Sequence, residues 1–122
     1  MTSIMFWNCK GAKKKEASHY LRNLIGENGM FFIGLIETKM ENLGREDVRK
    51  LVGNDWEFHH VAATGTSGGI LTLWKYRMAS FKIIDSSKQC IIGKLIIPKG
   101  NKAKVCIVYG IKICMKEENF KS

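Results

Sequence analysis

The chain has 122 residues, 45% of them hydrophobic and 25% charged, which is an ordinary composition for a single globular domain. Its longest apolar run is far shorter than the ~20 residues of a membrane helix, and no secretory signal opens it, so we expect a nuclear or cytoplasmic protein with no membrane partner. The net charge of +9 favours a polyanionic partner such as nucleic acid, although a basic domain without such a partner has the same charge.

The first third of the chain has the pattern of a strand–helix–strand unit. Residues 2–7 are apolar and aromatic and predict a short strand. A helix is predicted next, because apolar residues recur at helical spacing at Ala17, Tyr20, Leu21, Leu24 and Ile25. The following segment, "MFFIGLIE", is apolar without alternation, which is typical of a strand covered on both faces. This order indicates a βαβ unit with two parallel strands.

The remainder is predicted to contain one more helix and then only strands. The helix covers about residues 42–52 and is stopped by Gly53 and Asn54. Strands are predicted over 56–63, 70–74, 80–86, 90–98 and 105–110, with polar turns between them. Short strands in succession indicate antiparallel pairing. The predicted fold class is therefore α/β, with a βαβ start followed by mostly antiparallel strands.

Two oxygen-bearing side chains stand at the ends of the two parallel strands. Asn8 follows the first strand and Glu37 follows the buried strand. Because the carboxyl ends of parallel strands meet at one sheet edge, we expect these side chains to be neighbours. An amide oxygen and a carboxylate suit Mg²⁺, which takes few protein ligands and completes its shell with water and phosphate. The alternatives are a solvated strand end for Glu37 and a turn-forming Asn8.

Other candidates have weaker patterns. The basic residues Lys10, Lys13, Lys14 and Lys15 lie next to the predicted phosphate site, so they are candidate contacts to a DNA backbone, with a solvated helix face as the alternative. The "GTSGG" segment could cradle phosphate but is better read as a turn. His59 and His60 are adjacent on a strand and point to opposite faces, which argues against a metal pair. The four cysteines have no Cys-x-x-Cys spacing, so we expect reduced thiols with no disulfide partner.

Four motifs occur in a fixed order: "FWNCKG" at 6–11, "LIETKM" at 35–40, "SGGILTLW" at 67–74 and "VYG" at 108–110. The chain thereby resembles the endonuclease/exonuclease/phosphatase superfamily, and most closely the endonuclease domain of plant LINE-type (non-LTR) retrotransposon polyproteins. The resemblance covers the N-terminal half of that domain. It implies a partial four-layer α/β/β/α sandwich over residues 1–110, with a divergent, frayed tail over 111–122.

The resemblance also implies a reaction and its residues. The superfamily hydrolyses phosphodiesters with a divalent metal, usually Mg²⁺, and the retrotransposon branch nicks DNA to prime reverse transcription. Asn8 matches the active-centre asparagine and metal contact, and Glu37 matches the metal-binding glutamate. Tyr109 matches an active-site tyrosine on a later strand.

Several catalytic groups of the superfamily have no counterpart in this chain. No Asp-x-Asn segment follows Tyr109, no aspartate follows Asp85, and no histidine follows His60. Val108 stands where many members carry an asparagine. We therefore expect a truncated Mg²⁺-dependent DNA endonuclease domain that is inactive as this chain. The alternatives are a non-catalytic basic module that binds nucleic acid, and a relic open reading frame without function.

Overall fold

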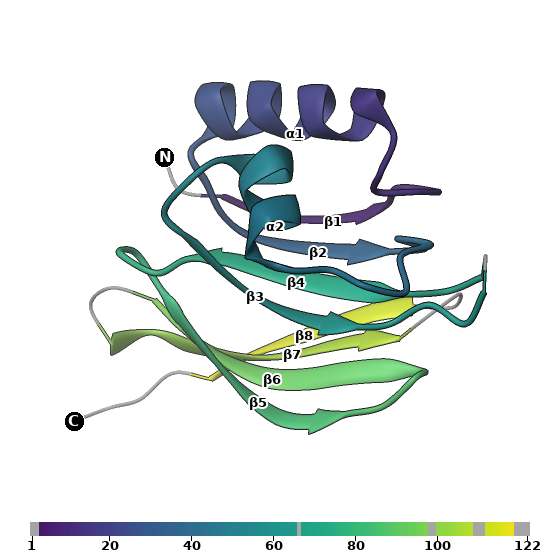
Figure 1. Ribbon diagram of the computed structural model, residues 1–122. Coiled ribbons are helices and arrows are strands. Elements are labelled where there is room, and N and C mark those ends of the chain that lie inside the picture. Colours follow the sequence, from purple (N-terminus) through teal and green to yellow (C-terminus); the bar gives the residue numbers. More distant parts are fainter. Residues whose placement is uncertain (1–2, 66, 98–99, 109–111, 119–122) are drawn as a thin grey trace.

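The computed structural model describes residues 3–65, 67–97, 100–108 and 112–118, which form two helices and two four-stranded sheets (Figure 1). The first sheet and its helices comprise β1 (Ser3–Asn8), α1 (Lys15–Asn28), β2 (Met30–Ile36), α2 (Arg45–Val52), β3 (Trp56–Val61) and β4 (Ile70–Lys75). The second sheet comprises β5 (Ser80–Ser86), β6 (Cys90–Ile96), β7 (Lys102–Val108) and β8 (Lys112–Glu118). The predicted α/β class is confirmed.

The first sheet contains the predicted βαβ unit. Its strand order is β1-β2-β4-β3, and β1 pairs with β2 in parallel while the other neighbours are antiparallel. Every residue of β2 is buried, as expected for a strand that has a neighbour on each side and cover on each face. The parallel register sets Asn8 opposite Ile36, so the two strands end at the same edge.

Both helices cover the outer face of the first sheet (Figure 1). Their buried residues pack on that face around Leu21 of α1 and Val48 and Leu51 of α2. The Arg22 guanidinium of α1 donates hydrogen bonds to the carbonyl oxygens of Arg49, at 2.9 Å, and Lys50, at 3.1 Å, near the end of α2. Neither described helix is long and apolar enough to cross a membrane.

The start of α2 differs from the sequence prediction of about residue 42. The helix begins at Arg45 because Gly44 is the N-cap, and its backbone N–H donates to the Asp47 carboxylate at 2.9 Å. A carboxylate three residues into a helix that reaches back to the cap fixes the first turn. Leu43 precedes this cap and packs against the core from outside the helix.

A second core fills the space between the two sheets. Phe32 of β2 is fully buried there, with ring centroids 6.1 Å from Phe6 and 4.9 Å from Phe81. Opposite them lie buried residues of the second sheet, including Ile91 and Ile107. A Cβ added at Gly34 would lie 2.8 Å from a side-chain carbon of Ile107 and of Phe6. Glycine at this position therefore permits the close approach of the sheets.

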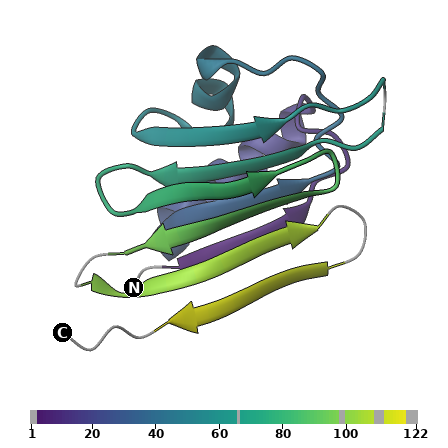
Figure 2. The ribbon, with the colours of Figure 1, turned by 90° about the horizontal axis from the view of Figure 1, so that it is seen from below.

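The second sheet is antiparallel throughout, in the order β5-β6-β7-β8. Residues 112–118, expected to be part of a frayed tail, form β8 and pair with β7 along its whole length, so that expectation is wrong for these residues. A strand at the edge of a sheet forms backbone hydrogen bonds with a neighbour on one side only. A sequence with many charged residues can form such a strand. Seen from below in Figure 2, this sheet faces the viewer, and no described helix covers it.

Candidate metal and nucleic-acid site

The structure brings Asn8 and Glu37 to one edge of the first sheet. Asn8 is the last residue of β1, and Glu37 directly follows β2. The pairing continues past the strands, because the Cys9 N–H donates to the Ile36 carbonyl oxygen at 3.1 Å and the Gly11 N–H donates to that of Glu37 at 2.8 Å. The two segments thus leave the sheet side by side, which places both predicted metal ligands at neighbouring positions.

The backbone at this edge has an uncommon conformation. Four non-glycine residues of the described chain have positive φ angles, and three of them are here: Lys10 at 50°, Glu37 at 60° and Lys39 at 57°. A left-handed conformation is uncommon for residues with a Cβ, and such residues cluster where a structure must hold a functional group in place. The conformation of Glu37 is an independent reason to regard it as a site residue.

A glycine loop holds the segment that carries Glu37. The Thr38 N–H donates to the Gly69 carbonyl oxygen at 3.3 Å, and the Lys39 N–H donates to that of Gly68 at 2.8 Å. Both glycines have positive φ, and a Cβ on Gly69 would collide with Thr38 Oγ1. Gly65 lies in a turn, as expected, and Thr64 pairs with Ser67 beside it; Gly68 and Gly69 also fix the backbone beside Glu37.

Cys9 lies beneath this edge as a buried thiol. Its Sγ lies 3.5 Å from the carbonyl oxygen of Ile36 and 3.7 Å from that of Glu37, and it donates to them. Burial raises the pKa of Cys9, the backbone N–H groups of Gly11 and Cys9 itself lower it, and the Glu37 carboxylate raises it further. The thiol therefore stays protonated at neutral pH and is a poor metal ligand.

The Asn8 side chain is exposed and makes one local contact. Its Oδ1 accepts a hydrogen bond from the Lys10 N–H at 3.3 Å, which is the turn-forming role expected as an alternative. A carbonyl oxygen has a second lone pair, so this hydrogen bond leaves one acceptor position for another ligand.

A wide cleft of about 890 Å³ opens beside Asn8; we call it the Asn8 cleft. It combines cationic, aromatic and polar side chains and is lined by Trp7, Asn8, Cys9, Lys10, Lys14, Glu16, Ala17 and Tyr20. The Trp7 and Tyr20 rings are 4.8 Å apart between centroids, and Tyr20 is 46% exposed. Glu37 is not among the lining residues, so the cleft includes only one of the two predicted metal ligands, Asn8.

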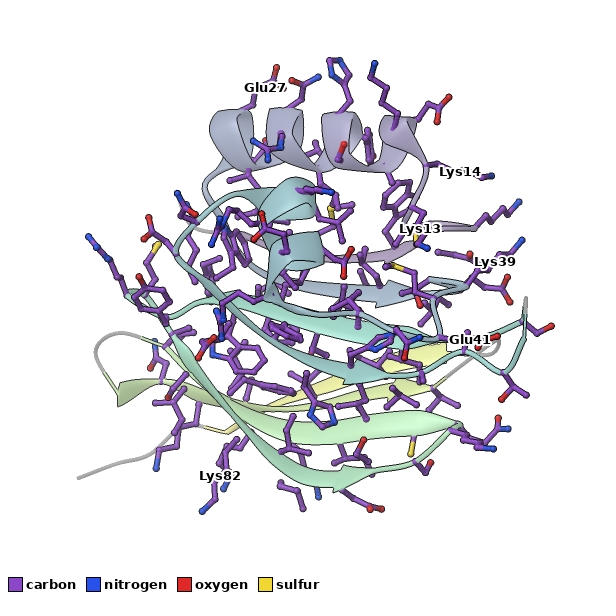
Figure 3. All side chains as sticks on the ribbon, viewed as in Figure 1. Lys13, Lys14, Glu27, Lys39, Glu41 and Lys82 are labelled. Atoms are coloured by element: carbon purple, nitrogen blue, oxygen red, sulfur yellow. The ribbon has the colours of Figure 1, made fainter. Side chains whose placement is uncertain are left out.

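A second cavity, of about 400 Å³, lies between the start of α1 and α2; we call it the lysine pocket. Its lining includes Lys13, Lys14, Lys15 and Lys50, with Asp47 as the one carboxylate. Figure 3 shows Lys13, Lys14 and Lys39 extending from the sheet edge at which β1 and β2 end. All of the lysines predicted as DNA contacts, Lys10, Lys13, Lys14 and Lys15, are exposed.

The sequence prediction missed Lys39 and Lys50. Lys39 stands two residues after Glu37, so its place in "LIETKM" was an available signal. Lys50 lies near the lysines at the start of α1 only because α2 packs on α1, and no local sequence pattern predicts that contact. Tyr109 lies outside the described residues.

The histidine pair behaves as ordinary strand residues. His59 Nε2 is hydrogen-bonded to Ser86 Oγ at 2.8 Å, which links the first sheet to the second. Burial lowers the pKa of both His59 and His60. In the described part of the chain, no three His, Cys, Asp or Glu side chains gather as a metal cluster. The donors that fit a divalent cation are therefore the Glu37 carboxylate and the Asn8 amide oxygen, a set that suits Mg²⁺ with water and phosphate.

Comparison with known proteins agrees with this fold. Among solved structures, the AP endonuclease LMAP from Leishmania major aligns with a TM-score of 0.62 and 17% identity, over 87% of this chain. The chain spans 39% of the length of that protein. No curated protein sequence matches. A family profile matches residues 5–114, which include Asn8, Glu37 and the glycine loop. The chain thus belongs to the Endonuclease/Exonuclease/phosphatase family.

Proposed function

We propose that this chain carries the metal-binding half of an endonuclease site of the retrotransposon type, and that it binds DNA and a divalent cation without cleaving the DNA by itself. The observation that carries the proposal is the paired ends of β1 and β2, where Asn8 and the left-handed Glu37 share one edge. Family members generally depend on a divalent metal. The cation, when bound, would polarise a phosphate oxygen.

The surroundings of Asn8 support a nucleic-acid ligand. Lys10 and Lys14 line the Asn8 cleft together with the Trp7–Tyr20 ring pair. Cationic side chains that follow a phosphate backbone, combined with an exposed aromatic ring, are typical of surfaces that bind single-stranded or locally opened nucleic acid. The lysine pocket extends this positive surface toward α2.

The proposed lack of cleavage follows from the residues that are absent from the sequence. No aspartate follows Asp85 and no histidine follows His60, so this chain has no counterpart of the family's water-activating aspartate or phosphate-contacting histidine. Loss of a general base alone typically lowers a rate by roughly 10²–10⁴-fold. Incubation of the chain with supercoiled plasmid and Mg²⁺ should give no nicking above background. Nicking that disappears in Glu37→Ala would contradict this part of the proposal.

The metal site is tested separately from cleavage, with paramagnetic Mn²⁺ as the probe. In the ¹⁵N-labelled chain, Mn²⁺ should broaden the amide signals of residues 8–11 and 36–39. In Glu37→Gln, about tenfold more Mn²⁺ or higher should be needed for the same broadening, because the substitution removes the single carboxylate of the donor set. The matched control is Glu27→Gln on α1, which changes the same charge at an exposed position far from the site (Figure 3). Equal broadening in Glu37→Gln and the unmodified chain would refute the site.

The DNA surface is tested by removing charge at the sheet edge. The triple substitution Lys10→Gln, Lys13→Gln, Lys14→Gln should weaken binding of a fluorescent duplex and a fluorescent single strand. For the duplex, the slope of the logarithm of the binding constant against the logarithm of the salt concentration should become less steep by about 0.9 for each lost phosphate contact. The control is Lys82→Gln, Lys94→Gln, Lys104→Gln on the second sheet, which lowers the net charge equally. If both triple variants lose affinity equally, only bulk charge attracts DNA.

A further inference from the structure

The lysine pocket gathers positive charge that the described structure does not neutralise. Its lining combines the three lysines at positions 13–15 and Lys50 with a single carboxylate, that of Asp47. This carboxylate already accepts the N–H of Gly44 at 2.9 Å, as part of the cap of α2. Every salt bridge of the described residues is made by an arginine, so none of the four lysines is paired in this way. The lining therefore has a net charge of +3.

The lysines at the start of α1 lower the stability of that helix. Lys14 is the N-cap, its side chain makes no capping hydrogen bond, and Lys15 is the first helical residue. The first turn of a helix is the positive end of its dipole, so cations there are unfavourable, and serine or aspartate would be a better cap. An anion in the pocket would offset this cost, because it attracts all of these side chains. The local sequence thus favours an occupied pocket over an empty one.

The helices and loops that form the pocket all belong to this chain, and they are held in place. Both helices lie on the same face of the first sheet (Figure 1), and the Arg22 guanidinium of α1 binds the Lys50 carbonyl oxygen of α2. The apolar part of the lining is buried and consists of Ala12, Met40 and Leu51. A ligand would therefore meet a cavity that is formed before it binds, which lowers the cost of binding.

The size of the lysine pocket favours the end of a nucleic-acid strand over its interior. Its volume of about 400 Å³ lies near the lower end of the range of small-molecule sites, about 300–1,000 Å³. An internal phosphate has chain on both sides, and proteins bind it in grooves that follow the backbone. A terminal phosphate has chain on one side only and can enter a pocket. Its charge of about −1.5 to −2 at neutral pH, against about −1 for an internal phosphate, also suits the cationic lining better.

We infer that the lysine pocket binds the phosphomonoester of a nucleotide, and that the chain therefore prefers DNA strands with a phosphorylated end. The inference rests on the proposed DNA binding and adds the class of DNA that is bound. Lys14 lines both the lysine pocket and the Asn8 cleft, so a strand held by its end can continue into that cleft. Lys50 lines only the pocket and Lys10 only the cleft, so the two parts can be tested separately.

The test compares fluorescent single strands of one sequence that carry a 5′-phosphate, a 3′-phosphate or a hydroxyl group at both ends. In fluorescence anisotropy, at least one phosphorylated strand should bind about five- to tenfold more tightly than the hydroxyl strand, and the end that gains identifies the polarity. A hydroxyl strand one nucleotide longer adds charge elsewhere and should bind at most about twofold more tightly. Equal affinities of phosphorylated and hydroxyl strands, or an equal gain for the longer strand, would overturn the inference.

Two matched variants assign the effect to the pocket. In Lys50→Gln the advantage of the phosphorylated strand should fall below about twofold. Lys10→Gln removes the same charge from the Asn8 cleft, so it should weaken the binding of all strands and leave the advantage unchanged. An advantage that persists in Lys50→Gln, or that both variants lose equally, would contradict the assignment to the lysine pocket.

Mononucleotides separate this inference from the proposed function. In the ¹⁵N-labelled chain, thymidine 5′-monophosphate or thymidine 3′-monophosphate should shift the amide signals of residues 12–18 and 47–51, and thymidine should not. If these shifts appear while no strand binds, the phosphate site is upheld with a free nucleotide as its ligand, and the proposed DNA binding fails. If all strands bind alike and the monophosphates cause no shift, DNA binding stands and the inference fails.

Discussion

Phe32→Ala should lower the free energy of unfolding by about 3–5 kcal/mol, the usual cost of deleting a fully buried aromatic side chain. Phe32 is 0% exposed and joins the two sheets, because its ring lies against Phe6 of β1 and Phe81 of β5. Removal of the ring would leave a cavity between two sheets that cannot both move inward. Since small domains are stable by about 5–15 kcal/mol, the variant should be close to unfolding.

The measurement is urea denaturation followed by fluorescence of Trp7, Trp56 and Trp74. Phe32→Leu serves as the matched control: it keeps the apolar character and most of the volume and should cost about 1–2 kcal/mol. A loss below about 1 kcal/mol for Phe32→Ala would mean that the second sheet does not pack on Phe32 in solution. The experiment therefore tests the sandwich itself and not only one contact.

Gly69→Ala should destabilise the chain by about 2–4 kcal/mol and should also weaken Mn²⁺ binding at Glu37. Gly69 has φ of +95°, which costs energy for any residue with a Cβ, and that Cβ would collide with the buried Thr38 Oγ1. Relief of the collision would move Thr38, whose neighbour is the proposed metal ligand. Stability and metal affinity should therefore fall together.

Two further variants separate the cost of the positive φ angle at Gly69 from the cost of the collision between the added Cβ and Thr38. Gly65→Ala has a similar backbone conformation, with φ of +62°, and open space around the added Cβ, so it should cost only about 1–2 kcal/mol. In the described structure Thr38 Oγ1 has no hydrogen-bond partner, so Thr38→Ala alone should be nearly neutral. Combined with Gly69→Ala, it should recover part of the loss. Additive effects in the double variant would contradict the collision.

The sequence was informative about the site wherever strand direction alone decides the geometry. An apolar strand, an amphipathic helix and a fully apolar strand imply parallel neighbours, and the register of Asn8 with Ile36 confirms that Asn8 and Glu37 share an edge. The fold class could be predicted for the same reason. Metal binding by these two residues is still a prediction. Contact between the neighbouring lysines and DNA is also still a prediction.

What the sequence did not reveal depends on contacts between distant residues. The glycine loop holds Glu37 from more than thirty positions along the chain, and "GTSGG" by itself looks like any turn. The helix boundary at Arg45 depended on a cap that apolar periodicity does not report. β8 was missed because its mixed charge resembles a solvated tail, although β7 supplies the backbone partners that make it a strand.

The strand order β1-β2-β4-β3 has a consequence for how the protein is made. As the chain leaves the ribosome, β2 acquires β1 as a neighbour early, but its other edge stays open until β4 emerges and inserts between β2 and the earlier β3. The backbone around Glu37 gains its last hydrogen bonds only when Gly68 and Gly69 have been synthesised. The proposed cation site is therefore a late product of folding, because no nascent chain that ends before Gly69 can form these hydrogen bonds.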